Sequence, residues 1–129
     1  MKFAFVSEKL TMSFDRGLEE RLYEYFQDRP DLVVKKMFGG LCFLLSDHMC
    51  CGIIGEQLMA RIGPKNYESC LAKEHATEMD FTGTPIKTMV YVNPNGFESD
   101  FDLTSWLNIC VIFVDSLPPI MALRLYNFS

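Results

Sequence analysis

Apolar side chains between residues 13 and 30 recur at steps of three and four positions, which predicts a helix with one buried face. The members of this face are Phe14, Leu18, Leu22, Tyr25 and Phe26. Ser13 is placed to cap the start of the helix, and Pro30 prevents the helix from continuing. Residues 1–12 show no clear period and are predicted to form an N-terminal extension.

Four short runs rich in strand-forming residues follow, LVVKKMF, LCFLL, MCCGII and LMARI. They are separated by Gly39-Gly40, by Ser46-Asp47-His48 and by Gly55-Glu56, which is turn chemistry at hairpin spacing. The pattern predicts a meander of antiparallel strands.

Gly39-Gly40 fits two different structures. A phosphate-binding loop leads from its glycines into the N-terminus of a helix, whereas these glycines lead into the strand pattern LCFLL. We therefore predict a bend or tight turn, where glycine is needed for a positive φ or for the close approach of another segment.

The second half of the chain contains a helix, a strand and a final helix. Gly63-Pro64 predicts a short helix over PKNYESCLAKEH, because proline favours the first turn. A turn at 82–85 leads into a predicted strand at 86–92. Ser99 and Asp102 resemble a capping box at the start of the last helix, which Pro118-Pro119 stops. The apolar stripe of that helix is Leu103, Trp106, Leu107, Cys110, Val111, Val114 and Leu117.

The predicted order of elements is α-β-β-β-β-α-β-α. Helices and strands do not alternate as βαβ units would, so the class is α+β. We predict two layers, with helices packed on one antiparallel sheet of about five strands. The length of 129 residues and the 49% hydrophobic content suit one domain that needs no disulfide or metal to hold its core.

The net charge of −5 argues against direct binding to DNA, because affinity for nucleic acids comes largely from Lys and Arg. The most apolar stretch, LTSWLNICVIFVDSL, is too short to span a bilayer, and the start of the chain lacks the features of a secretion signal. We therefore predict a cytoplasmic protein without a membrane partner.

No catalytic constellation is predicted from the sequence. His48 and Cys50 share one face of a predicted strand, but a zinc site needs four ligands and no second pair is present. Neither His48 nor His75 is placed to activate a nucleophile. We predict no catalytic residue, no metal and no cofactor.

The five cysteines, an odd number without disulfide-framework spacing, suit a reducing compartment. If Ser46-Asp47 is a two-residue hairpin loop, Cys42 lies opposite Cys51. We interpret them as two buried thiols that pack as small apolar side chains.

Three cations, Lys36, Arg61 and Lys87, lie on or beside three of the predicted strands. They are either solvated side chains on an open sheet face or a small basic patch that binds an acidic segment of a partner protein. We keep them as candidate partner-binding residues.

The ordered set of motifs in this chain resembles the TfoX N-terminal domain family. The resemblance covers residues 14–119. The matching motifs are Met37-Phe38-Gly39-Gly40, Arg61-x-Gly63-Pro64, Met79-Asp80-Phe81-x-Gly83, Pro85-x-Lys87, Val90-Tyr91-Val92 and a helix that contains Trp106. We interpret the glycines, prolines and aromatic residues of these motifs as turn and core positions that serve the structure.

The resemblance implies the α+β fold shared with type III secretion chaperones. It also implies a regulatory role, because members named TfoX or Sxy regulate natural competence in bacteria, acting with a cyclic-AMP receptor protein. Those regulators carry a second, C-terminal TfoX domain, for which the segment after Leu117 is too short. We expect a family-like domain over residues 13–119 followed by an apolar tail over 120–129.

We predict a non-enzymatic regulatory or protein-interaction domain with an unidentified protein partner. The alternative is an enzyme or small-ligand-binding protein that uses the sheet face. The apolar tail, IMALRLYNFS, is expected to pack on its own domain or in a homodimer, because exposed apolar side chains promote association.

Overall fold

The computed structural model describes residues 14–37, 39–80 and 83–120. The predictions for Ser13, for Phe38, for Phe81, for the extension at 1–12 and for the tail beyond Ile120 lie outside the described residues.

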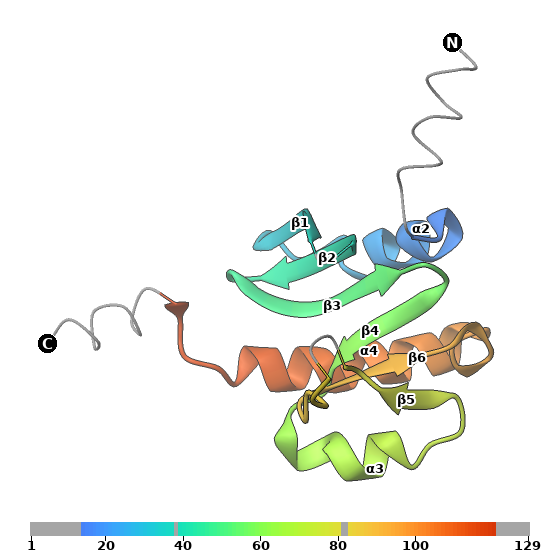
Figure 1. The fold of residues 1–129 in the computed structure, drawn as a ribbon. Helices are drawn as coiled ribbons and strands as arrows, with labels where there is room; N and C mark the ends of the chain where they lie inside the picture. The colour runs from blue at the N-terminus through green and yellow to red at the C-terminus, as the bar shows by residue number, and fades with distance from the viewer. Residues whose placement is uncertain (1–13, 38, 81–82, 121–129) are drawn as a thin grey trace, which may run out of the picture.

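Six strands form one antiparallel sheet in the order β1-β2-β3-β4-β6-β5, which confirms the α+β class and adds one strand (Figure 1). The strands are β1 (Leu32–Met37), β2 (Gly40–Leu45), β3 (His48–Ile54), β4 (Gln57–Arg61), β5 (Ala76–Glu78) and β6 (Met89–Val92). The predicted four-stranded meander is confirmed by the pairing of β1 through β4.

Helices pack on one face of this sheet, as Figure 1 shows for α4. The helices are α2 (Arg16–Tyr25), α3 (Tyr67–Leu71) and α4 (Asp100–Asp115), with 3₁₀ turns η1 (Pro64–Asn66) and η2 (Pro94–Gly96). Ser99 caps α4 as predicted, since its side chain accepts a hydrogen bond from the Asp102 amide at 3.0 Å. Asp15 caps α2, accepting from the Leu18 amide at 2.8 Å.

Two predicted boundaries are wrong, the end of the helix after Gly63 and the start of the strand at 86–92. The predicted helix after Gly63 begins as the 3₁₀ turn η1 and ends at Leu71, because the chain then turns through His75, which has a φ of 77°. The short strand β5 follows and pairs with β6. The strand predicted at 86–92 starts only at Met89, since the Met89 amide closes a turn on the Ile86 carbonyl.

The predicted pairing of Cys42 with Cys51 is also wrong. Ser46 and Asp47 form the two-residue hairpin loop, both with positive φ, as a type I′ turn requires. A bulge between Phe43 and Leu44 then shifts the register, so that Cys42 pairs with Gly52 and Phe43 with Cys51. One extra residue on β3 therefore moves the two thiols to different faces.

The main core lies between the sheet and helices α2 and α4. Its fully buried members include Leu22, Phe43, Ile53 and Leu107. The opposite sheet face carries a second apolar cluster that contains all five methionines of the described residues. They are Met37, Met49, Met59, Met79 and Met89. Methionine is unbranched and packs into irregular space, which suits a face that none of the described helices covers.

Arg29 joins the end of the α2 segment to the sheet and to α4. Its guanidinium makes two hydrogen bonds to the Asp31 carboxylate, at 2.9 and 3.0 Å, and two to Asp115, both at 3.0 Å. Ser46 in the β2–β3 turn donates to Asp31 at 2.8 Å. The pKa of Asp31 is therefore well below its ordinary value, first because of the bonds from Arg29 and then because of the bond from Ser46.

We expect acid to weaken this junction. A carboxylate whose folded pKa is depressed contributes stability above its unfolded pKa of about 4, and this contribution is lost as the pH falls toward the folded pKa. Between pH 5 and pH 3 the free energy of unfolding of the wild type should fall by roughly 1 kcal/mol more than that of Asp31→Asn. Urea titrations at both pH values measure the difference. Glu20→Gln, on an exposed part of α2, is the control, and equal acid sensitivity of wild type and Asp31→Asn would contradict the assignment.

Candidate functional site

The Gly39-Gly40 motif is a structural bend, and each glycine is needed for a different reason. Gly39 has a φ of 78° with open space where a side chain would be. Gly40 begins β2 against the neighbouring strand, and a Cβ atom there would lie 2.1 Å from the Ile53 carbonyl oxygen. The motif thus joins β1 to β2, and the chain continues into a strand as predicted.

The Arg61-x-Gly63-Pro64 motif surrounds one aromatic side chain, Phe113 of α4. Gly63 has a φ of 84°, and a Cβ atom at this position would lie 2.5 Å from Cδ1 of the Phe113 ring. The Arg61 guanidinium lies 5.5 Å from the ring centroid, within the range of a cation–π contact. Pro64 begins the 3₁₀ turn η1. The motif therefore holds the Phe113 ring of α4 against Arg61 and Gly63, where β4 ends.

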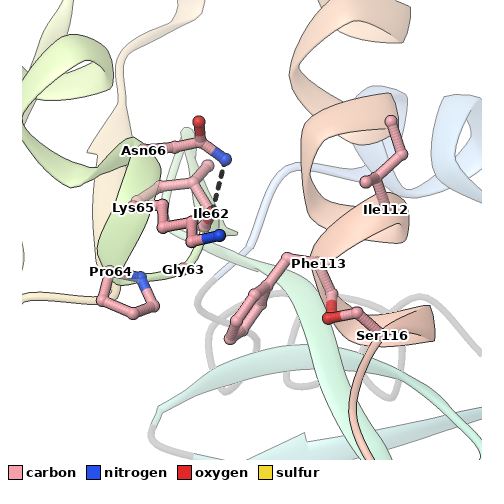
Figure 2. Close-up of a pocket in the computed structure, with 8 residues that line it drawn as sticks. All are labelled: Ile62, Gly63, Pro64, Lys65, Asn66, Ile112, Phe113 and Ser116. Carbon is pink, nitrogen blue, oxygen red and sulfur yellow. Dashed lines mark hydrogen bonds between the residues drawn. The ribbon is translucent and has the colours of Figure 1, made fainter.

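A surface hollow of about 290 Å³ opens beside this ring, and we call it the η1–α4 groove. Its lining residues are Ile62, Gly63, Pro64, Lys65, Asn66, Ile112, Phe113 and Ser116. Figure 2 shows the residues of η1 on one side and Ile112 and Phe113 of α4 on the other. Asn66 donates to the Ile62 carbonyl at 3.1 Å and so fixes the first wall.

Cations gather near the groove although the chain as a whole is acidic. Lys65 lines it, and Lys87 precedes Thr88, whose carbonyl accepts hydrogen bonds from the Ile62 and Gly63 amides at 3.0 Å. Arg61 donates to the Met49 carbonyl at 3.1 Å. Burial lowers the pKa of Arg61 from its ordinary value, while the nearby Cys50 thiol acts in the opposite direction.

The three cations kept as candidate partner-binding residues are only partly brought together. Arg61 and Lys87 lie at the Ile62–Gly63 backbone, whereas Lys36 is on edge strand β1, with β2 and β3 between it and β4. Lys65 was not predicted, and neither was the outward position of Ile112, which is 72% exposed. The signal was present in α4, where Ile109, Ile112 and Phe113 add apolar residues outside the predicted stripe.

Two other hollows hold charged groups that already have partners. In one, Arg21 donates to the Phe97 carbonyl at 2.9 Å and lies 3.3 Å from the Asp100 carboxylate. In the other, the Lys73 amine lies 4.8 Å above the Trp106 ring. In both hollows these contacts link neighbouring elements of the fold.

The remaining motif residues have structural contacts. Gly83 has a φ of 85°, and its amide donates to the Asp80 carboxylate at 2.6 Å, which closes the turn before β6. Tyr91 is half-buried on β6, and burial followed by the charge of Asp80 raises its pKa. Trp106 is 5% exposed and donates from Nε1 to the Gly96 carbonyl at 3.2 Å.

The five cysteines are all buried and unpaired. Burial raises the pKa of Cys51 and Cys110 well above the ordinary value, with neighbouring thiols adding to the effect. His48 lies against the carbonyl of Pro118, with Nε2 at 2.7 Å. Within residues 14–37, 39–80 and 83–120, no three His, Cys, Asp or Glu side chains are placed to share a metal ion.

The fold and the groove define a small α+β domain with one helix-covered sheet and an apolar, cation-bordered surface hollow. The family model described as TfoX N-terminal domain matches residues 24–113, and the chain belongs to this family. No curated protein and no solved structure matches the chain. Among the described helices, none has the length and apolar character needed to cross a membrane.

Proposed function

We propose that this chain is a non-enzymatic regulatory domain that acts by binding another protein in the cytoplasm. Membership of the family that includes competence regulators supports a regulatory role. The observation that carries the binding role is the η1–α4 groove, whose lining is mainly apolar and whose nearby cations contrast with the acidic net charge of −5.

The size and lining of the groove favour a protein partner over a small-molecule substrate. Its volume of about 290 Å³ lies at the lower limit of ligand pockets, which span roughly 300–1,000 Å³. It suits one or two side chains of a partner better than an enclosed substrate. The sheet face opposite the helices carries methionines, Cys42, Leu44, Ile54, Ile86 and Tyr91, which offer little acid–base chemistry. Buried free thiols fit a reducing compartment.

The proposal is tested by capture from a lysate of the source organism. Tagged protein should retain a defined protein partner at physiological salt, and treatment with nuclease should not release it. An excess of untagged protein should compete for that partner, which is the control for specificity.

Two results would contradict the proposed function. One is capture that depends on nucleic acid, together with nanomolar binding of the purified protein to a defined DNA duplex at physiological salt. The other is turnover of a small molecule from a metabolite extract by the purified protein. Either result would replace protein binding as the biochemical role.

A further inference from the structure

The cations at the η1–α4 groove have no carboxylate partner in the described part of the chain. Arg61 contacts a carbonyl and an aromatic ring, and neither Lys65 nor Lys87 forms an ion pair there. The other partly buried arginines, Arg21 and Arg29, each have a carboxylate at 3.3 Å or less. Of the three, Arg61 is half-buried, whereas Lys65 and Lys87 are exposed. A cation that lacks a counter-charge is a position where an incoming carboxylate gains binding energy.

Apolar side chains form the centre of the same surface. Ile112 is 72% exposed, and the Phe113 ring is held at the base of the groove by Gly63. Pro64 and Ile62 contribute the opposite wall, as Figure 2 shows. An apolar centre with a polar rim is the usual arrangement of a protein-binding surface.

We infer that the η1–α4 groove binds an acidic, amphipathic segment of the partner protein. A large apolar side chain of that segment lies in the groove between Pro64 of η1 and Ile112 and Phe113 of α4, and carboxylates of the segment face Lys65 and Lys87. This inference rests on the proposed function and names the chemistry of the partner.

The same observations disfavour nucleic acid as the occupant. Phosphates would use the cations but would leave Pro64, Ile112 and Phe113 without apolar partners at the groove. The remaining acidic residues of the chain would also repel a polyanion, since the net charge is −5. An acidic peptide with apolar side chains satisfies both parts of the surface.

The test is a selection of displayed random peptides on the purified full chain, followed by anisotropy titration of the enriched peptides with fluorescent labels. Enriched peptides should carry net negative charge and at least one large apolar residue. Ile112→Glu should weaken their binding by about tenfold or more, because it removes apolar contact and adds a repelling charge. Lys65→Glu should weaken it by roughly threefold to tenfold, with a smaller loss at high salt.

Matched controls lie elsewhere on the same molecule. Phe101→Glu changes an 80% exposed residue in the first turn of α4, and Lys36→Glu changes an exposed lysine on β1. Both variants should bind the enriched peptides as the wild type does. Circular dichroism of all four variants checks that the fold is kept, which is expected because each changed side chain is exposed.

Several outcomes would overturn the inference. They are a failure to enrich any peptide, enrichment of basic or uncharged peptides, and binding that Ile112→Glu leaves unchanged. Binding of a random DNA duplex that Lys65→Glu abolishes would assign the groove to nucleic acid. A concentration-dependent dimer that Ile112→Glu dissolves would assign it to a second copy of the chain.

The proposed function and this inference can fail separately. If a captured partner binds Ile112→Glu as tightly as it binds the wild type, protein binding stands and the groove is not its site. If the groove binds acidic peptides but no protein is captured from lysate, the groove is a peptide-binding surface and the proposed binding of a regulatory partner is contradicted.

Discussion

Gly40→Ala is expected to destabilise the domain severely, whereas Gly39→Ala should be mild. The added Cβ at Gly40 would lie 2.1 Å from the Ile53 carbonyl oxygen and 3.3 Å from the Ile54 Cα, so β2 and β3 must separate to admit it. Overpacking against a backbone costs about 3 kcal/mol or more, a large part of the roughly 5–15 kcal/mol that holds a domain together. The Cβ added by Gly39→Ala would lie in open space. This variant should lose only about 1–2 kcal/mol of stability, because alanine is less favourable than glycine at a left-handed φ.

Urea unfolding followed by circular dichroism measures both variants. Gly55→Ala is the matched control, because Gly55 also has a positive φ with open space around it. It should behave as Gly39→Ala does. Equal stability of the Gly40 and Gly39 variants would show that close approach of the backbone is not what position 40 requires.

Trp106→Ala is the second substitution with a large expected effect. The side chain is 5% exposed within the core formed by α4 and the sheet, and its Nε1 hydrogen bond holds the Gly96 carbonyl. Truncation of a buried tryptophan costs roughly 3–5 kcal/mol. Trp106→Phe keeps most of the volume and loses the hydrogen bond, so it should cost about 1–2 kcal/mol.

The measurement is again the free energy of unfolding by circular dichroism, since Trp106 is the only tryptophan and fluorescence would be lost. Phe101→Ala, which removes an 80% exposed ring from the same helix, should change stability by less than about 0.5 kcal/mol. A Trp106→Phe variant as unstable as Trp106→Ala would show that the hydrogen bond matters more than the packing.

Turn and cap positions in this fold could be predicted from the sequence because their chemistry is local. Ser46-Asp47 forms the hairpin loop. Gly39 and Gly83 take positive φ, and Ser99 caps α4, each as its residue type favours. Ser13 is the predicted cap of α2, and Asp15, which directly precedes the helix, makes the bond to the Leu18 amide. Both residue types are good caps, and their spacing alone does not choose between them.

The register of β2 on β3 and the shape of the η1–α4 groove could not be predicted, because both depend on contacts between separate segments of the chain. The bulge beside Leu44 adds one residue to β3, and nothing in the local sequence marks where the ladder must shift. Strand β5 is three residues long and is formed by pairing with β6. The groove forms where Gly63 meets Phe113, and these residues are far apart in the sequence. Its shape could therefore not be predicted from either segment by itself.

Strand β1 is one edge of the sheet, and its sequence LVVKKM would otherwise suit continued pairing with a second molecule. Lys35 and Lys36 are exposed on it, beside Val33, which is 42% exposed. Two like charges on an open edge make the approach of an identical edge unfavourable, and lysine is the residue that natural sheets most often use there. The adjacent lysines thus disfavour pairing of β1 with the same edge of a second molecule.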